Sequence, residues 1–217
     1  MTRNVLIAGA GPGVSGSLAR RYAAEGAALA LIGADAGVLE TLAAEVAEAG
    51  GRATTALIDL TDEAATRAGV TALAEGLGSV DVAHFNPSAY TEKGPLELTV
   101  DELLADVRLG VGALLPFVQA ARPFMSSGSR ITVTGSMAAD KPWFGACSLG
   151  VQKAGIQNLV RSLDAALKDD GIRAVSVTVR GLLKKEGPFA PDNVAAALRA
   201  AIDQPEEAWQ AEIAYAG

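Results

Sequence analysis

The sequence predicts a single α/β domain, a doubly wound parallel sheet of about seven strands with helices on both faces. Three observations support this prediction. Short runs of aliphatic and β-branched residues alternate with longer amphipathic stretches, and a glycine-rich turn follows the first run. The chain has 217 residues, of which 50% are hydrophobic, and this is enough material for one well-buried domain.

Seven short runs have the composition of buried strands, and their alternation with helical stretches indicates βαβ units in a sheet covered on both faces. The predicted strands are Val5–Ala8, Ala28–Ile32, Ala53–Ile58, Val80–Phe85, Arg130–Thr134, Ala174–Val179 and Glu212–Tyr215.

The stretches between these strands predict helices. They are Ser15–Glu25, Val38–Ala49, Glu63–Glu75, Val100–Ala121, Leu149–Lys168 and Asn193–Asp203. Thr99 and Glu102 form a capping-box pattern that opens the fourth helix. Because no repeat or linker interrupts the series, residues 1–217 are expected to form one domain. Its ligand crevice is expected at the carboxyl ends of the strands.

Charge and composition exclude several classes of function. With 18 Lys and Arg against 25 Asp and Glu, the net charge is −7, and no basic run favours nucleic acid or a membrane surface. The first apolar run is shorter than a signal-peptide core, and no later run approaches the roughly 18 apolar residues of a membrane span. We therefore expect a cytoplasmic protein. A single cysteine, Cys147, and a single histidine, His84, predict no disulfide and no metal site.

Four glycines in eight residues follow the first strand, and Gly9, Gly11 and Gly13 precede a helix that begins near Val14. Glycines let the backbone approach a pyrophosphate closely, and the helix amino terminus offers free N–H groups to the same anion. The turn therefore predicts the phosphate site of a dinucleotide. A tight turn without a ligand is the alternative.

A second pattern lies between the fifth predicted strand and the fifth predicted helix. Ser136 and Lys153 stand seventeen positions apart, and Leu149 precedes the lysine by four. This spacing resembles the active-site serine and Y-x-x-x-K motif of the short-chain dehydrogenase/reductase family, with leucine in the tyrosine position. The resemblance runs from Val5 to the carboxyl terminus. It implies a Rossmann-type domain that binds NAD or NADP.

The resemblance also implies roles for individual residues. Asp59, followed by Leu60, would bind the adenine amino group, and Asn86 would border the cofactor. Lys153 would hold the ribose hydroxyls, and Ser136 would steady the developing oxyanion. In the plainer alternative, Ser136 only ends a strand and Lys153 is a solvated helix residue.

Other positions depart from the family pattern. Ala8 and Ser15 replace the first threonine and last glycine of T-G-x-x-x-G-x-G, and Leu109, or Arg108 with a one-residue shift, takes the place of the helical asparagine. Arg180 replaces the proline of the P-G motif that follows the sixth strand and borders the cofactor. The loop at 182–190, which usually covers the substrate, is short, and this predicts an open site.

Two assignments carry open alternatives. A leucine has no proton to give, so we take Tyr90, on the loop after the fourth strand, as the candidate proton donor; otherwise it is a surface aromatic. Asp35 follows the second strand and slightly favours NAD over NADP through a ribose 2′-OH contact, or else caps the next helix.

Three functions follow from these features. The first is an NAD(P)-dependent oxidoreductase of a small carbonyl or alcohol with a non-standard proton donor. The second is an inactive dinucleotide-binding or scaffold protein, and the third is a non-redox enzyme that uses the same crevice. The resemblance also implies a homodimer or homotetramer assembled through the helices Val100–Ala121 and Leu149–Lys168, which carry more apolar residues than one buried face needs.

Overall fold

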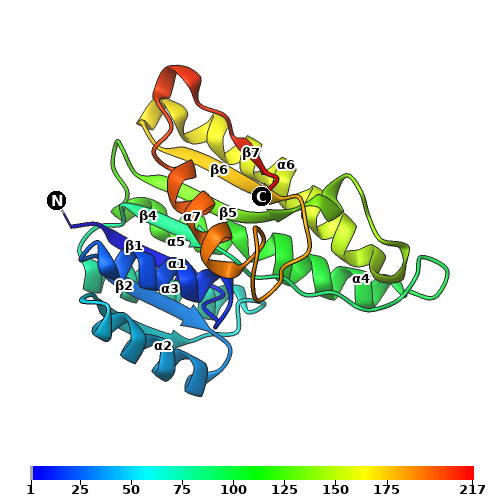
Figure 1. Cartoon of the computed structure of the whole chain (residues 1–217), viewed down its shortest axis with the longest axis horizontal. Coiled ribbons are helices and arrows are strands. Elements are labelled where there is room, and N and C mark those ends of the chain that lie inside the picture. The colour runs from blue at the N-terminus through cyan, green and yellow to red at the C-terminus, as the bar shows by residue number, and fades with distance from the viewer. Residues whose placement is uncertain (1) are drawn as a thin grey trace.

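The computed structural model describes residues 2–217, and its seven strands form one parallel sheet in the order β3-β2-β1-β4-β5-β6-β7. The strands are β1 (Asn4–Ala8), β2 (Ala28–Gly33), β3 (Arg52–Leu57), β4 (Val82–Phe85), β5 (Arg130–Ser136), β6 (Arg173–Val179) and β7 (Glu212–Tyr215). The strand order reverses direction between β1 and β4, as a doubly wound sheet requires, and this confirms the predicted fold class (Figure 1).

Helices cover both faces of the sheet. They are α1 (Val14–Ala24), α2 (Ala36–Glu48), α3 (Glu63–Leu77), α4 (Val100–Val107), α5 (Leu114–Ala121), α6 (Cys147–Leu167) and α7 (Pro191–Ala201). Figure 1 shows α1, α2 and α7 on one face and α3, α5 and α6 on the other. Along β1, Val5 and Ile7 pack into the first layer, and Leu6 and Ala8 pack into the second, since successive side chains of a strand alternate.

The ends of several elements differ from the prediction by one or two residues. The strand predicted over Val80–Phe85 begins at Val82, because the amide of Val80 donates to the carbonyl of Phe124 rather than joining the ladder. Cys147 and Ser148 extend α6 beyond its predicted start at Leu149, because the helix begins directly after a short 3₁₀ turn over Phe144–Ala146.

The prediction of one continuous helix over Val100–Ala121 is wrong. The structure divides it into α4, a π-helical turn over Arg108–Gly112, and α5. Gln152 of α6 packs against this turn, where a Cβ on Gly110 would lie only 1.9 Å from the Gln152 Cδ. The Gln152 Nε2 also donates to the carbonyl of Asp106 at 3.0 Å. A side chain inserted beside the helical ladder is a common cause of such a turn.

The combined stretch Val100–Phe124 is long and apolar enough, by composition, to cross a membrane. This differs from the expectation that no run approaches a membrane span. A core helix passes the same test, and Leu114, Phe117 and Val118 are buried in the layer between α5 and the sheet. The apolar character of this stretch therefore serves the core of the domain.

Candidate functional site

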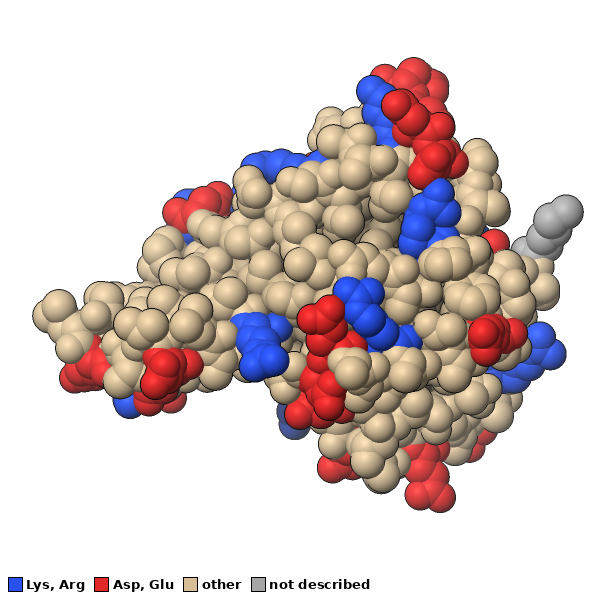
Figure 2. All heavy atoms as spheres, turned by 180° about the vertical axis from the view of Figure 1, so that it is seen from behind, with Lys and Arg blue, Asp and Glu red and all other residues tan. Residues whose placement is uncertain are grey.

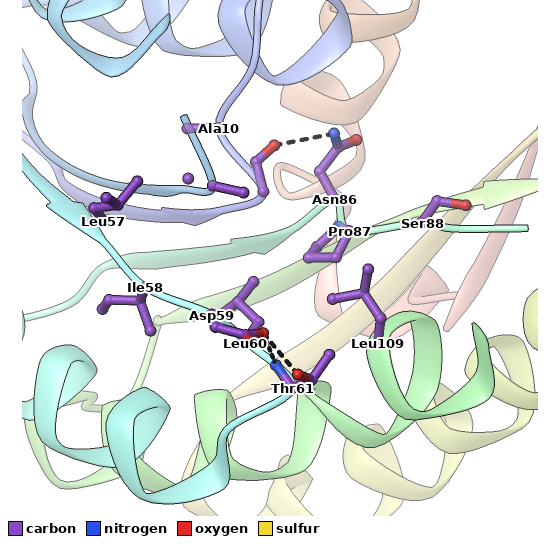
Figure 3. Close-up of a pocket in the computed structure, with 13 residues that line it drawn as sticks. Ala10, Leu57, Ile58, Asp59, Leu60, Thr61, Asn86, Pro87, Ser88 and Leu109 are labelled. Carbon is purple, nitrogen blue, oxygen red and sulfur yellow. Dashed lines mark hydrogen bonds between the residues drawn. The ribbon is translucent and has the colours of Figure 1, made fainter. Parts of the chain in front are cut away.

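A cavity of about 720 Å³ opens at the carboxyl ends of β1, β2, β3 and β4. Its walls come from the glycine turn, from the residues after β2, β3 and β4, and from the π-helical turn (Figure 3). The lining residues are Gly9, Ala10, Gly33, Ala34, Leu57, Ile58, Asp59, Leu60, Thr61, Asn86, Pro87, Ser88 and Leu109. This is the switch point of the sheet, where a ligand of a doubly wound fold is expected.

Ser15 fixes the glycine turn. Its hydroxyl donates to the carbonyl of Gly9 at 2.9 Å and accepts from the amide of Gly11 at 3.0 Å. The family pattern has a glycine at this position, and the serine replaces it with a side chain that ties the turn to α1. Gly13 is the N-cap of α1, and no side chain caps the helix there. The amides of the first turn, from Val14 on, are therefore free to bind an anion.

Two glycines are required by the shape of this turn. Gly9 has a φ of +74°, and a Cβ there would lie 2.8 Å from the backbone nitrogen of Pro87. At Gly16, a Cβ would lie 2.5 Å from the carbonyl oxygen of Gly11. Gly11 and Gly13 have open space where their side chains would be. The turn is therefore packed tightly against the protein and is open on the side that faces a ligand.

Asp59 lies at the far wall of the cavity from Asn86 (Figure 3). Its Oδ1 accepts from the amide of Thr61 at 2.9 Å and from the Thr61 hydroxyl at 2.7 Å. These hydrogen bonds lower the pKa of the Asp59 carboxyl, so the group is ionised and its Oδ2 remains able to accept. Leu60, which follows it, is buried in the core and lines the cavity with its edge.

Asn86 is held by a chain of buried and partly buried polar groups. Its Oδ1 accepts from the Thr134 hydroxyl at 2.7 Å, and its Nδ2 donates to the carbonyl of Gly9 at 3.3 Å. The Thr134 hydroxyl also lies 3.5 Å from the Nε2 of His84, whose Nδ1 lies 2.7 Å from the Thr132 hydroxyl. Burial lowers the pKa of His84 to about 3, so this imidazole is neutral. His84 therefore supports the floor of the cavity from inside the sheet.

Lys153 is buried on α6, with 5% of its surface exposed. Its Nζ donates to the carbonyl of Thr134 at 3.2 Å, and burial lowers the pKa of the amine to about 8. The alternative of a solvated helix residue is therefore wrong for Lys153. Ser136 lies two residues beyond Thr134 on β5, and its Oγ accepts from the amide of Ala138 at 3.2 Å. Leu149 stands one turn before Lys153 on the same helix.

Eight predicted site residues are not among those that line the cavity, namely Gly11, Gly13, Val14, Asp35, Tyr90, Ser136, Lys153 and Arg180. The Asp35 carboxylate accepts from the amide of Val38 at 2.8 Å and so caps α2, in agreement with the second of its two interpretations. Arg180 forms an ion pair with Asp140 at 2.5 Å. Tyr90 is 55% exposed on the loop after β4.

Sequence reasoning missed Gln152, which is fully buried next to Lys153. Its Oε1 accepts from the Ser88 hydroxyl at 2.9 Å, and its Nε2 donates to the carbonyls of Ala89 and Asp106. One side chain thus joins the cavity wall at Ser88, the loop that follows it, and α4. A polar residue on the apolar face of a predicted helix was the one available signal.

The residues present fit a dinucleotide. The glycine turn would hold the pyrophosphate at the amino terminus of α1, Asp59 would accept from the adenine amino group, and Asn86 and Lys153 would lie near the nicotinamide half. The volume and the mainly apolar lining of the cavity also suit flat aromatic rings.

Comparisons with known proteins agree with this geometry. The sequence model of the family described as short chain dehydrogenase matches residues 3–184. Meso-2,3-butanediol dehydrogenase of Serratia marcescens is 28% identical over 174 residues, which cover 80% of this chain and 68% of that protein.

Two solved structures share the fold. A dehydrogenase/reductase from Sinorhizobium meliloti superposes with a TM-score of 0.89 at 21% identity, covering 98% of this chain and 92% of the other. The NADH-dependent reductase A1-R′ complexed with NAD gives a TM-score of 0.80 at 22% identity, covering 90% and 86%. The fold, the cavity and the family match together show that this chain belongs to the short chain dehydrogenase family of oxidoreductases.

Proposed function

We propose that this chain is an NAD(P)-dependent oxidoreductase that interconverts a small carbonyl compound and its alcohol with a non-standard proton donor, since position 149 carries leucine instead of the family's tyrosine. The observation that carries the proposal is the cavity at the carboxyl ends of β1 to β4, with Gly9, Asp59 and Asn86 in its walls. Lys153 is buried and donates from Nζ to the carbonyl of Thr134, the residue whose hydroxyl donates to Asn86.

Each residue has a defined task in this proposal. The bound nicotinamide cofactor supplies or accepts a hydride. Asn86 and Pro87 support the cofactor side of the cavity, and the hydroxyl of Ser136 donates a hydrogen bond to the substrate oxygen as negative charge develops there. Lys153 binds ribose hydroxyls with its ammonium. The short loop at 182–190 leaves the substrate side open, so a range of small carbonyls has access.

The preference between NAD and NADP rests on few residues. In this proposal NAD is slightly favoured, because the end of β2 and the two residues after it, Gly33-Ala34-Asp35, contain no arginine for a 2′-phosphate. Support also comes from the A1-R′ structure, whose name describes an NADH-dependent reductase. The capping hydrogen bond of Asp35 uses Oδ1 and leaves its second oxygen for a ribose hydroxyl.

A specific observation favours a second candidate function. Leu149 occupies the tyrosine position, and an aliphatic side chain cannot transfer a proton. A dinucleotide-binding or scaffold protein without turnover is therefore the alternative, and a non-redox enzyme that uses the same cavity is a third.

One experiment separates these functions. Purified protein is titrated with NADH and NADPH by fluorescence and then assayed for oxidation of each cofactor against a panel of aldehydes and ketones. The proposal expects saturable binding and turnover of at least one carbonyl. Saturable binding with no turnover would support the scaffold function, and conversion of a carbonyl substrate without cofactor oxidation would support the non-redox enzyme.

We further propose that the chain forms a homodimer or homotetramer through α4, α5 and α6. Figure 2 views the side that α3, α5 and α6 cover, and most of that surface is uncharged. Leu104, Leu115 and Val151 on these helices are 57%, 40% and 51% exposed. Multi-angle light scattering should give a mass well above the 22.0 kDa of one chain, and Leu104→Glu should lower it. A wild-type protein that stays at one chain mass at micromolar concentration would reject this assembly.

A further inference from the structure

The residue that donates a proton to the substrate is the open question in this site. Tyr90 is exposed on its loop and does not line the cavity, and no hydrogen bond directs its hydroxyl toward the site among residues 2–217. Ser136 carries a hydroxyl at the end of β5, but a serine hydroxyl holds its proton too tightly to be the net source. It can only pass on a proton that another group supplies.

Lys153 has the geometry of such a source. It is buried, and its one hydrogen bond to protein among residues 2–217 goes from Nζ to the carbonyl of Thr134. An ammonium has three N–H groups, so two remain for other acceptors. Lys153 and Ser136, like Tyr90, are not among the residues that line the cavity, but Thr134 connects the amine to the cavity wall: its carbonyl accepts from Nζ, and its hydroxyl donates to Asn86, which lines the cavity. Ser136 follows two residues along the same strand, so the two side chains share one face of β5.

Leu149 stands where the family pattern has the tyrosine whose hydroxyl meets this amine. It lies one helical turn before Lys153, so both side chains occupy the same face of α6. A leucine is shorter than a tyrosine by most of the phenol ring. In carbonyl reduction, a substrate oxygen, or one water between that oxygen and the ammonium, takes the place that the phenol hydroxyl has in the family pattern, and proton transfer through one water is efficient.

The charged groups on the elements packed around Lys153 are engaged elsewhere. Asp106 of α4 accepts from the amide of Thr91 at 2.7 Å, and Asp140, after the 3₁₀ turn Met137–Ala139, pairs with Arg180 at the end of β6. His84 of β4 is neutral. Burial alone lowers the pKa of this amine to about 8. An acid with this pKa both gives and regains a proton near neutral pH.

We propose that the ammonium of Lys153 is the proton donor for carbonyl reduction in this chain, a role that rests on the oxidoreductase function proposed above. The hydride of the reduced cofactor forms the new C–H bond at the carbonyl carbon, so the cofactor is oxidised and the carbonyl is reduced. One N–H bond of Lys153 breaks as the new O–H bond forms on the substrate oxygen, directly or through one water. The neutral amine then takes a proton from solvent, and in the alcohol-oxidising direction it accepts the proton.

The matched variants are Lys153→Arg and Lys153→Met, with Lys168→Arg, an exposed lysine just beyond α6, as the control. Arginine keeps the positive charge for ribose but does not release a proton below about pH 12. We expect NADH affinity to change by less than about tenfold in Lys153→Arg, while kcat falls by roughly 10²-fold or more. Lys153→Met should lose turnover and part of the cofactor affinity, and circular dichroism verifies the fold of both variants.

Two further measurements test the proton itself. The wild-type kcat for reduction should be constant below pH 8 and fall as the pH rises through about 8, because only the ammonium donates. Nuclear magnetic resonance of ¹⁵N-lysine protein, with the Lys153 signal assigned from Lys153→Arg, should show the same midpoint in the absence of any substrate.

The outcomes separate this inference from the proposed function. If wild type turns over a carbonyl and Lys153→Arg keeps that rate, the oxidoreductase function stands and the lysine donor is overturned. The same holds if Tyr90→Phe abolishes turnover while Lys153→Arg does not. If wild type binds NADH but reduces no carbonyl, the proposed function fails and the donor role fails with it, whatever the Lys153 titration shows.

Discussion

Leucine at position 149 and lysine at position 153 make this site chemically unlike the family pattern that surrounds it. The lysine is buried without a carboxylate partner among the described residues, and its amine is held by a single backbone carbonyl. In the family pattern an adjacent phenol uses this charge. Here the charge faces an aliphatic side chain. No ion pair among the described residues offsets the free-energy cost of burying the ammonium. The functional role proposed above accounts for this buried amine.

Leu149→Tyr should raise carbonyl-reductase activity or create it. The new hydroxyl would stand one helical turn before Lys153 and near Ser136, and the ammonium would lower its pKa. A positioned acid contributes roughly 10²–10⁴-fold in rate. Steady-state kinetics on the carbonyl panel measure the effect, with the unfolding midpoint as the control for folding. An unchanged rate with cofactor bound would show that Leu109 or Arg180 also limits the chemistry.

Lys153→Met should change the pH dependence of stability. Burial lowers the pKa of Lys153 from 10.5 to about 8, so the folded state carries the cost of the charge below pH 8. This cost disappears as the pH rises from 8 to 10.5, where both states become neutral. The methionine variant should therefore gain stability relative to wild type by about 3 kcal/mol more at pH 7 than at pH 10.5.

Denaturant unfolding of the two proteins at several pH values between 7 and 10.5 measures this difference. Groups that both proteins share cancel in the comparison. A difference that does not depend on pH would mean that the amine titrates normally in the folded protein.

Gly9→Ala and Gly11→Ala form a matched pair. Gly9 has a positive φ, and a Cβ there would collide with Pro87, whereas no atom lies within 4 Å of the Cβ position at Gly11. We expect Gly9→Ala to lower the free energy of unfolding by about 1–3 kcal/mol, and Gly11→Ala to change it by less than about 0.5 kcal/mol. Urea denaturation compares them. Equal effects of the two substitutions would show that the turn is not constrained by Pro87.

The cavity residues that could be predicted from the sequence are those whose place follows from their position in the chain relative to a strand or a motif. Gly9, Asp59 and Asn86 line the cavity because each stands within two residues of the end of a strand, and the carboxyl ends of parallel strands meet at one edge. Residues whose role depends on contacts between distant elements were missed. His84 and Gln152 act through partners on other strands and helices, and no local pattern identifies those partners.

At the level of elements, α4, the π-helical turn and α6 act as one unit. The amide of Gln152 links Ser88 in the cavity wall to the carbonyls of Ala89 and Asp106, and Gly110 provides the space for it. Apolar periodicity predicted one continuous helix over Val100–Ala121, because a single wide turn barely shifts the pattern. The deviation was set by a side chain 42 positions after Gly110, beyond the reach of a local reading.

Gln152→Ala should destabilise the protein strongly, because it removes the hydrogen bonds that the buried Gln152 side chain donates to the carbonyls of Ala89 and Asp106. Loss of a buried hydrogen-bonding group costs about 1–3 kcal/mol for each partner left unsatisfied. The control is Gln119→Ala, since Gln119 is exposed and accepts only from Arg67; it should cost less than about 0.5 kcal/mol. Chemical denaturation gives both values. Comparable losses in the two variants would remove the structural role assigned to Gln152.

At the level of the whole molecule, the fold was predictable because strands and helices alternate without interruption from β1 to β7. The right-handed crossover of βαβ units leaves few topologies for such an alternation. The strand order then determines where a ligand binds, since the connections that follow the neighbouring strands β1 and β4 lead to opposite sides of the sheet at the switch point. The reacting groups were less predictable, because they depend on how α6 lies against β5 and on which side chain fills position 149.

A crystal structure of the protein with NADH tests the central claim most directly. We expect the pyrophosphate at the glycine turn and the amino terminus of α1, the adenine beside Asp59, and the nicotinamide near Asn86 and Ser136. The ammonium of Lys153 should lie within about 3.5 Å of a ribose hydroxyl, or of a water next to the reactive face of the nicotinamide. A structure grown in excess NADH whose cavity holds no dinucleotide, or in which NADH binds elsewhere, would contradict the account.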